Sequence, residues 1–359
     1  MTDMTLAELA ELIGGELTVP GDVPIRGMAS IELAGPREVT FLANARYERH
    51  MKDTRAAAVI VGSQYAGPGE RLIRCEDPYF AFREGMVALY GRREPHFEGI
   101  DPRACIDPSA ELGEGVRVGA FAVIGPRASI GAGTTIYPGV YVGPDVRIGS
   151  DCTLWPNVTL YDGTIVGSRV RIHAGTSIGQ DGFGYATHGG AHHKIPEAGW
   201  VELEDDVEIG ACCAIERATL GATVIGAGTK FADLIAIGHG TRLGKHCLMV
   251  SQSGIAGSTS VGDYCVFAAQ SGMVGHIRIG DGVQVAAQSG VTNDVPAGQQ
   301  VLGSPATPLG DARRAMVLTS RLPQMRSALR NLTKEVAELK RRLDLREGTG
   351  DGDDPAEGT

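Results

Sequence analysis

Aromatic residues are scarce in this chain of 359 residues: they account for 5% of it, and two are tryptophans. A fold with so few aromatic side chains has to build its interior from aliphatic residues. Long apolar segments are lacking too, since no run approaches the ~20 residues that span a bilayer. The N-terminal sequence MTDMTLAELAEL carries acidic residues and does not resemble a secretion signal. We therefore expect a cytoplasmic protein without a transmembrane segment.

Paired cysteines and an excess of positive charge are also missing. The seven cysteines are odd in number and form no CxxC pair, so we expect reduced thiols, most of them buried, rather than a disulfide framework. The net charge of −10 argues against general nucleic-acid binding. These absences leave a reduced, acidic protein with an aliphatic core.

Glycine, in contrast, is abundant, with 51 residues, and the central part of the chain repeats in sixes. No helix has a period of six, and a simple strand has a period of two. A hexad repeat indicates short strands joined by tight turns and wound into a prism around a buried aliphatic stack. We expect a mainly β fold, a left-handed parallel β-helix of about nine to ten coils. The repeated positions are Ile106, Leu112, Val118, Ile124, Ile130, Ile136, Val142, Ile148, Leu154, Leu160, Val166, Ile172, Ile178, Leu203, Ile209, Ile215, Ile225, Phe231, Ile237, Leu243, Met249, Ile255, Val261, Phe267, Met273, Ile279, Val285 and Val291.

The repeat covers only part of the chain and thereby divides it. Residues 1–100 read as a small α/β domain, with helices in TLAELAELIGG and FAFREGMVALY and strands in VTFLA, AAAVIVG and RLIRC. The β-helix takes residues 101–307. The count fails over 181–201, where we expect an excursion loop of the kind that often carries function. A smaller break near 218–223 predicts a bulge in one coil.

The repeat changes once more in residues 308–345. Eight apolar residues from Leu318 to Leu343 are spaced four and three apart, a seam that predicts association between helices. Because Pro323 lies inside this seam, we expect helices with a break near Leu322 rather than one straight rod.

Charge is unevenly distributed at the C-terminal end. Nine Lys or Arg stand against four Asp or Glu between Asp311 and Asp344, so this stretch suits an acidic partner. The last residues, 346–359, are charged and rich in glycine, and we expect them to be disordered.

Two of the nine histidines fall at special places in the hexads. The first and fifth positions of a hexad point inward, whereas His239 is third in the Ile237 hexad and His276 is fourth in the Met273 hexad. Three hexads make one coil, so residues 18 apart stack at about 4.8 Å, and Gly257 therefore lies one coil beyond His239. An imidazole beside a free backbone N–H is suited to acyl transfer, because the base takes a proton and the N–H stabilises an oxyanion. From spacing alone, exposed surface histidines are the competing interpretation.

Four small residues, each 18 apart, form a second column: Ala236, Gly254, Gly272 and Gly290. A row of residues without bulky side chains predicts a straight groove along the prism. We expect this groove to hold an acyl chain, with its far end setting the chain length. The competing interpretation is that turns simply favour glycine.

Three further histidines, His188, His192 and His193, cluster in the excursion loop. Their HxxxHH spacing in a glycine-rich loop is a weak pattern for metal ligands, and we expect no metal site.

Several separate segments carry a family resemblance over nearly the whole chain. They are TLAELAELIGGEL and FLANARY in the first domain, DGFGY and HKIP in the loop, VEIGACCAIERATL after it, IGHGTRLGKHCLMVSQSGIAGST and VGHI in the later coils, and LGSPATP before the C-terminal helix. Together they resemble the UDP-3-O-(3-hydroxyacyl)glucosamine N-acyltransferases, hexapeptide acyltransferases of lipid A biosynthesis. Hexads alone would fit many acyltransferases, and DGFGY with this N-terminal domain is more specific.

The resemblance implies roles for the residues of the later coils. His239 matches the general base that deprotonates the 2-amino group of UDP-3-O-(3-hydroxyacyl)-glucosamine as the amine attacks a thioester. His276 matches a second active-site histidine, and the Gly257 amide matches the oxyanion donor. The (R)-3-hydroxyacyl donor would be acyl-4′-phosphopantetheine on acyl carrier protein, a co-substrate, with no cofactor required.

The resemblance also assigns residues outside the catalytic coil. Phe41, Asn44 and Tyr47 match uracil-recognising residues, since two aromatics offer stacking faces and an asparagine pairs with a base edge. The family forms homotrimers, which agrees with the heptad seam. We look for contacts with the carrier protein among four basic residues, Arg313, Arg314, Arg321 and Arg326.

The sequence departs from the family pattern around the catalytic histidine. Ala232 and Asp233 stand where Asp-Asn is frequent, Gly240 replaces an asparagine, and Ala236 replaces a glutamine. The base is intact, but the contacts to the sugar ring change, with Asp233 retained as a substrate-binding candidate.

Alternative functions remain open. The sister UDP-sugar O-acyltransferases share the β-helix but lack an α/β domain before it, and acetyl-CoA-dependent sugar N-acetyltransferases would not need the glycine column. A non-catalytic β-helix scaffold predicts that His239→Ala is harmless, and a carbonic-anhydrase-like protein predicts bound zinc.

Overall fold

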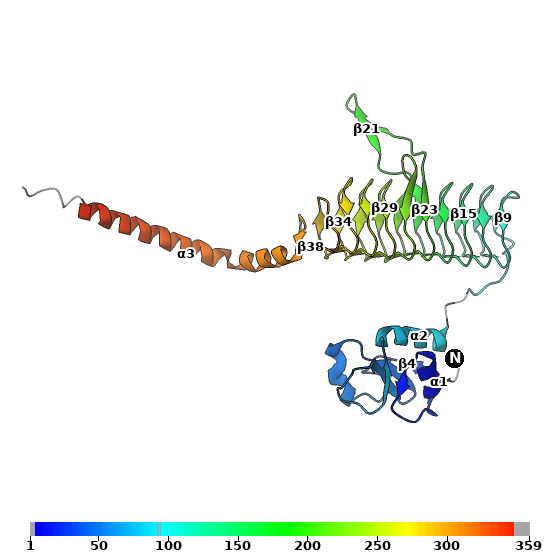
Figure 1. Ribbon diagram of the computed structural model, residues 1–359. Helices are drawn as coiled ribbons and strands as arrows, with labels where there is room; N and C mark the ends of the chain where they lie inside the picture. The colour runs from blue at the N-terminus through cyan, green and yellow to red at the C-terminus, as the bar shows by residue number, and fades with distance from the viewer. Residues whose placement is uncertain (1–3, 92, 94, 348–359) are drawn as a thin grey trace, which may run out of the picture. The chain divides into compact units, whose positions relative to one another are not determined.

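The computed structural model describes residues 4–91, 93 and 95–347, and it separates into two compact units, Met1–His96 and Phe97–Thr359. Most of the predicted tail, residues 348–359, lies outside the described residues. Each unit has its own hydrophobic core. Figure 1 shows the ribbon of each unit.

The first unit is a small α/β domain around a five-stranded sheet ordered β2-β7-β6-β5-β4. Helix α1, Leu6–Leu12, begins with a capping box, in which the Thr5 side chain and the Glu8 side chain each bond the other's backbone. Its elements in chain order are β1 Met4–Thr5, α1 Leu6–Leu12, β2 Glu16–Leu17, β3 Pro24–Ile25, β4 Gly27–Met28, β5 Glu38–Phe41, the 3-10 helix η1 Ala45–Lys52, β6 Ala58–Gly62, β7 Leu72–Cys75 and α2 Pro78–Tyr90.

The second unit is a parallel β-helix with three sheets along its length, which confirms the fold class predicted from the hexads. Sheet I contains β10 Arg117–Val118, β13 Thr135–Ile136, β16 Thr153–Leu154, β19 Arg171–Ile172, β24 Glu208–Ile209, β27 Lys230–Phe231, β30 Leu248–Met249, β33 Val266–Phe267, β36 Gln284–Val285, β38 Gln300–Leu302 and the antiparallel β39 Thr307–Pro308. Sheet II contains β8 Cys105–Ile106, β11 Val123–Ile124, β14 Tyr141–Val142, β17 Thr159–Leu160, β20 Ser177–Gln180, β25 Ala214–Glu216, β28 Ala236–Ile237, β31 Gly254–Ile255, β34 Gly272–Met273 and β37 Gly290–Val291. Sheet III contains β9 Glu111–Leu112, β12 Ser129–Ile130, β15 Arg147–Ile148, β18 Ile165–Val166, β23 Trp200–Leu203, β26 Ala222–Ile225, β29 Arg242–Leu243, β32 Ser260–Val261 and β35 Arg278–Ile279.

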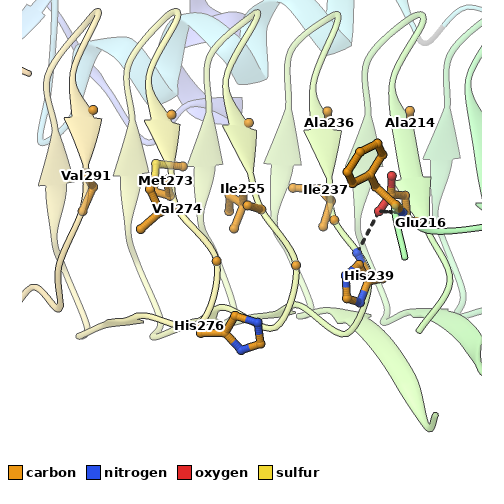
Figure 2. Close-up of a pocket in the computed structure, with 18 of the residues that line it drawn as sticks. Ala214, Glu216, Ala236, Ile237, His239, Ile255, Met273, Val274, His276 and Val291 are labelled. Carbon is orange, nitrogen blue, oxygen red and sulfur yellow. Dashed lines mark hydrogen bonds between the residues drawn. The ribbon is translucent and has the colours of Figure 1, made fainter. Parts of the chain in front are cut away.

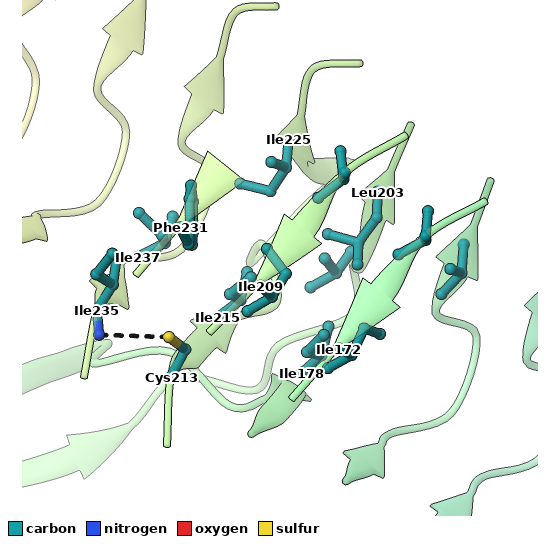
Figure 3. Close-up of a cluster of buried hydrophobic side chains, with 14 of the residues drawn as sticks. Ile172, Ile178, Leu203, Ile209, Cys213, Ile215, Ile225, Phe231, Ile235 and Ile237 are labelled. Atoms are coloured by element: carbon teal, nitrogen blue, oxygen red, sulfur yellow. Dashed lines mark hydrogen bonds between the residues drawn. The ribbon is translucent and has the colours of Figure 1, made fainter. Parts of the chain in front are cut away.

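The first residue of each hexad fills the interior of the prism. Ile172, Ile215 and Ile225, one from each sheet, are fully buried, and Figure 3 shows such side chains packed together inside the coils. Burial of an isoleucine contributes about 1.5–3 kcal/mol, so the aliphatic stack stabilises the coils without aromatic residues. The fifth position is also inward: Cys152, Cys213, Cys247 and Cys265 are all buried free thiols.

The excursion loop leaves the prism after β20. It forms a hairpin of β21, Tyr185–His188, and β22, Ala191–Lys194, which projects from the coils in Figure 1. Gly189 and Gly190 form its two-residue turn with φ of 60° and 78°, as a tight hairpin turn requires.

The smaller break in the count also has a structural counterpart. Leu203 pairs with Ile225, 22 residues along the chain, whereas residues of neighbouring uninterrupted coils pair 18 apart. The additional residues lie between β25 and β26, and the aliphatic stack resumes on their far side.

Helix α3, Leu309–Glu347, is continuous, with Pro323 inside it (Figure 1). The expectation of separate helices with a break near Leu322 was therefore wrong. A proline removes one backbone hydrogen bond and crowds the carbonyl one turn earlier, at a cost of about 3 kcal/mol, and the many remaining bonds of a 39-residue helix keep it in one piece. Within the part of the chain that the structure describes, no helix is both long and apolar enough to cross a lipid bilayer.

Candidate functional site

A groove of about 710 Å³ runs along the outer face of sheet II in the later coils. Its lining includes His239, His276 and Gly257, together with the four small residues of the predicted column. The structure thus places seven of the residues singled out from the sequence on one concave surface (Figure 2). Concave, mostly apolar sites with a few polar groups are the usual form of small-molecule sites.

His239 and Gly257 face each other across one coil. A β-carbon built on Gly257 would lie 2.6 Å from Nε2 of His239, so the imidazole occupies the space that a side chain there would need. The carbonyl of His239 accepts a hydrogen bond from the Ser258 N–H at 2.8 Å, which fixes the two corners relative to each other. Among the described residues, the Gly257 N–H has no hydrogen-bond acceptor. It is therefore available to a ligand beside the imidazole.

His276 lies on the same edge of the prism and is exposed (Figure 2). Its backbone takes a left-handed conformation with φ of 63°, which places its side chain at a corner. Its N–H donates to the Gly257 carbonyl at 3.2 Å. The backbones of the two histidines thus bond neighbouring residues of one corner, His239 to Ser258 and His276 to Gly257.

The column of small residues forms the floor of the groove. Ala236, Gly254, Gly272 and Gly290 pair in direct register from strand to strand, so the column spans about 14 Å at the usual spacing of strands. A β-carbon on Gly272 would meet no atom within 4 Å, whereas one on Gly290 would lie 3.0 Å from Oγ of Ser304. The groove is therefore open in the middle and bounded at the Gly290 end.

Among the lining residues that sequence reasoning missed, Glu216 carries a charge and Phe183 an aromatic ring. Glu216 occupies the position after the inward Ile215, where an acid faces outward one coil before His239. That register was available from the hexad count, and it would have brought Glu216 to the site. Phe183 could not be assigned to the site because it belongs to the excursion loop, where the hexad repeat is absent and does not predict the position of a side chain.

A second pocket, of about 510 Å³, lies in the first unit and is lined by Phe41, Asn44 and Tyr47. The Phe41 ring stacks on Phe82 with centroids 4.2 Å apart, and this contact fixes the orientation of the Phe41 ring. Asn44 caps η1 by accepting a hydrogen bond from the Arg46 N–H through Oδ1. Within the described part of the chain its NH₂ group has no acceptor, so it can donate to a ligand.

Other predicted residues lie apart from the groove. Asp233 sits at a different corner, and its carboxylate accepts a hydrogen bond from the Ala211 N–H at 2.7 Å. The four arginines considered for carrier contacts lie along α3, and each is exposed.

The loop histidines do not converge. His192 and His193 are neighbours on β22, so their side chains point to opposite faces of the hairpin. His192 contacts the Thr187 hydroxyl at 3.0 Å, and His193 contacts the His188 carbonyl at 3.2 Å. Within the described ranges, no group of three or more His, Cys, Asp or Glu side chains is arranged to hold a metal ion.

Comparison with known proteins relates this architecture to two family models. The model described as UDP-3-O-(3-hydroxymyristoyl) glucosamine N-acyltransferase, LpxD, matches residues 22–84, within the first unit. The model for bacterial transferase hexapeptide repeats matches residues 127–162 and 145–180, in the β-helix. Each unit of the chain therefore contains a match to a transferase family model, and the match in the first unit is to an N-acyltransferase.

Curated relatives match over nearly the full length. The UDP-3-O-acylglucosamine N-acyltransferase of Syntrophotalea carbinolica is 56% identical over 94% of this chain and 98% of its own. The enzyme of the same name from Nitratidesulfovibrio vulgaris is 53% identical over 94% and 98%. Among solved structures, Arabidopsis UDP-N-acetylglucosamine acyltransferase is 25% identical with a TM-score of 0.52, covering 64% of this chain and 82% of its own, which supports the β-helix fold. The chain belongs to the UDP-3-O-acylglucosamine N-acyltransferase family.

Proposed function

We propose that this N-acyltransferase of lipid A biosynthesis moves an (R)-3-hydroxyacyl chain from acyl carrier protein to the 2-amino group of UDP-3-O-(3-hydroxyacyl)-glucosamine, with His239 as the general base. The observation that carries the proposal is the His239 imidazole lying against Gly257, whose N–H points to no partner among the described residues, in a groove floored by small residues. A base, an oxyanion donor and an apolar channel are what acyl transfer from a thioester requires.

The reaction follows from these positions. The amine nitrogen attacks the thioester carbonyl carbon while His239 takes a proton from the nitrogen. The carbonyl oxygen becomes negatively charged and is stabilised by the Gly257 N–H. When the tetrahedral intermediate collapses, the carbon–sulfur bond breaks, and the imidazolium returns its proton to the leaving thiolate. The amide and the free thiol of the carrier are the products, so no cofactor is needed.

The nucleotide of the acceptor and the acyl chain of the donor would be bound by different sets of residues. The pocket of Phe41, Asn44 and Tyr47 has the aromatic faces and amide group to bind uracil. The column from Ala236 to Gly290 has the length and apolar lining to take the transferred chain. Asp233 stays a prediction for the sugar, although its carboxylate already caps a backbone N–H.

The surface of helix α3 supports two proposed partners, further copies of this chain and the acyl carrier protein. Its eight-residue apolar seam is exposed, with Leu329 66% accessible, and an exposed heptad seam supports assembly with further copies, which we propose to be a homotrimer. The basic residues of α3 suit an acidic carrier protein. We also propose a cytoplasmic location, which seven free thiols support.

A direct assay tests the function. The protein is incubated with UDP-3-O-acyl-glucosamine and 3-hydroxyacyl carrier protein, and the N-acylated product is sought by mass spectrometry. We expect product with the wild type and almost none with His239→Ala. No product from the wild type, or equal product from both, would overturn the proposal. Replacing the acceptor by UDP-N-acetylglucosamine tests the alternative O-acyltransferase, and acetyl-CoA as donor tests an acetyltransferase.

Sedimentation of the purified protein tests the assembly. A mass near three chains supports the trimer, and Leu329→Asp should reduce it because a charge in an apolar seam opposes helix association. A monomeric wild type would contradict this part of the proposal.

A further inference from the structure

The groove contains one carboxylate that the proposed mechanism does not use, that of Glu216 at the end of β25. Its Oε2 accepts two backbone hydrogen bonds, from the His239 N–H at 3.0 Å and from the Phe183 N–H at 3.3 Å. The first of these is drawn in Figure 2. One oxygen atom thus joins the corner that carries the proposed base to the excursion loop. Hydrogen bonds to a charged acceptor are about twice as strong as neutral ones.

The excursion loop packs closely against His239 at Gly182. A β-carbon on Gly182 would lie 2.6 Å from Cβ of His239, so the loop approaches this closely only because residue 182 has no side chain. On the returning part of the loop, the Lys194 ammonium donates to the carbonyls of Gly182 at 3.1 Å and Ile195 at 3.0 Å. The start of the loop is therefore held both by Glu216 and by Lys194.

The segment that presents Glu216 is itself held firmly. The next residue, Arg217, has a side chain that is 11% exposed. Its Nε donates to the Gly179 carbonyl at 2.7 Å, and one terminal nitrogen donates to the carbonyl and carboxylate of Asp162 at 2.8 and 3.0 Å. The carboxylate of Glu216 therefore projects from a rigid strand end rather than from a mobile loop.

The anchored loop places an aromatic ring in the groove. Phe183 is 82% exposed, yet it lines the groove beside Ala214 and Glu216. This is the end away from Gly290, so an acyl chain that follows the glycine column leaves Phe183 uncovered. The acceptor has to approach His239 from this remaining end, and the apolar C–H face of a sugar ring or the acyl chain already on it offers surface for an aromatic ring.

We infer that Glu216 is a positioning residue that fixes His239 and the DGFGY segment together, and that the Phe183 ring held by this anchor contacts the acceptor. The contact of Phe183 rests on the proposed function, whereas the anchoring does not. Loss of the anchor leaves the imidazole present but loosens the backbone that orients it and the loop segment that carries Phe183.

The chain offers a matched control for Glu216. At another edge of the prism, Oε2 of Glu204 accepts a hydrogen bond from the Ala227 N–H at 2.9 Å, again 23 residues along the chain, and Glu204 does not line the groove. Glu204→Ala removes the same kind of backbone anchor, so it reports the structural cost alone.

Kinetics and amide exchange then test the inference. For Glu216→Ala we expect kcat/KM to fall by about tenfold or more. Glu216→Gln should partly restore it, because an amide oxygen still accepts both N–H groups. Glu204→Ala should keep wild-type kinetics. Phe183→Ala should raise KM for the acceptor and leave KM for the acyl donor unchanged.

Hydrogen exchange followed by NMR or mass spectrometry provides a readout that needs no activity. The amides of Phe183 and His239 should exchange faster in Glu216→Ala than in the wild type, and not in Glu204→Ala. Unchanged exchange at both amides would overturn the anchor, even in a protein whose wild type acylates nothing. Anchoring confirmed by exchange together with an inactive wild type would instead reject the proposed function. An unchanged acceptor KM in an active Phe183→Ala would overturn the contact assigned to Phe183.

Discussion

The imidazole of His239 fills the space in which a side chain of Gly257 would have to stand: a β-carbon there would lie 2.6 Å from Nε2. Gly257 is not in the left-handed region of backbone conformation, so alanine is compatible with its backbone. We therefore expect Gly257→Ala to fold normally and to displace the imidazole, with kcat lowered about 10²-fold or more. Steady-state kinetics and a thermal melt measure both quantities. A variant with full activity would contradict the assigned position of the base.

The two histidines should differ in the size of their effects. A general base contributes typically 10²–10⁴-fold, so His239→Ala should lose about that factor in kcat. The hydrogen bond from His276 to Gly257 is made by its backbone N–H, which alanine retains, so His276→Ala should cost less in kcat. Parallel kinetic measurements of the two variants provide the comparison. A larger loss from His276→Ala than from His239→Ala would reverse the proposed roles.

The hexad register explains why much of this site was predictable from sequence. Buried Ile237 and Thr241 fix which positions point inward, and they place His239 outside the core without any structure. The same register aligns Ala236 with Gly254 and Gly272, as the strand pairing shows. A repeat of fixed length turns sequence separation into distance, which an irregular fold does not allow.

The residues that escaped prediction lie where this register ends. Gly182 reaches His239, and Phe183 reaches the groove, through a loop held by hydrogen bonds to Glu216 and from Lys194. No periodicity in the sequence specifies these contacts. Helix α3 is a similar case, because local reasoning at Pro323 favoured a break, whereas the hydrogen bonds of the rest of the helix keep it continuous.

The nucleotide pocket allows recognition to be separated from folding. Asn44→Asp retains the oxygen that caps η1 through the Arg46 N–H, so stability should hold, but it replaces the amide donor by a carboxylate. We expect a higher KM for the UDP-linked acceptor, by about tenfold or more, and an unchanged KM for the donor. Asn44→Ala should show the same kinetic defect and also lose about 1 kcal/mol of stability with the cap. An equal KM for the acceptor in the wild type and both variants would show that uridine does not bind in this pocket.

The thiols provide a test of the fold that does not depend on catalysis. Burial raises the pKa of Cys152 to about 11, and a thiol reacts through its thiolate. At pH 8 we expect rapid reaction with a thiol reagent only at exposed Cys105 and Cys212, and reaction of all seven cysteines after unfolding. Peptide mapping of the labelled protein identifies the sites. Fast labelling of Cys152 in the native protein would contradict the predicted interior of the coil.

The same pKa gives the direction of a pH effect on stability. Because the pKa of Cys152 is higher in the folded protein than its ordinary value of 9.0, the stabilisation from the neutral thiol is complete below pH 9. It is lost as the pH rises through about 11. Urea unfolding at pH 8 and at pH 10.5 should therefore show a smaller difference in Cys152→Ala than in the wild type. An equal difference would mean that this thiol does not contribute to the loss.

The groove floor yields the sharpest test of what the column of small residues does. Space above Gly272 is open, so a methionine there meets no protein atom at its β-carbon and should leave the fold intact. Its side chain would nevertheless lie across the channel between Gly254 and Gly290, about 10 Å beyond the Ala236 end. Long acyl donors should then lose kcat/KM, while donors too short to reach Gly272 should be used as well as before.

Comparison with two further variants separates blocking from general damage. Ser260→Met puts the same side chain at the equivalent outward position of β32, on sheet III and outside the groove, and it should leave the preference for acyl length unchanged. Gly290→Met acts at the bounded end beside Ser304, so it should reject only the longest donors. Product analysis with a series of acyl carrier protein thioesters gives the length profile of each variant. If Gly272→Met and Gly290→Met had the profile of the wild type, the acyl chain would have to lie on another face, and the aligned glycines would not mark its binding site.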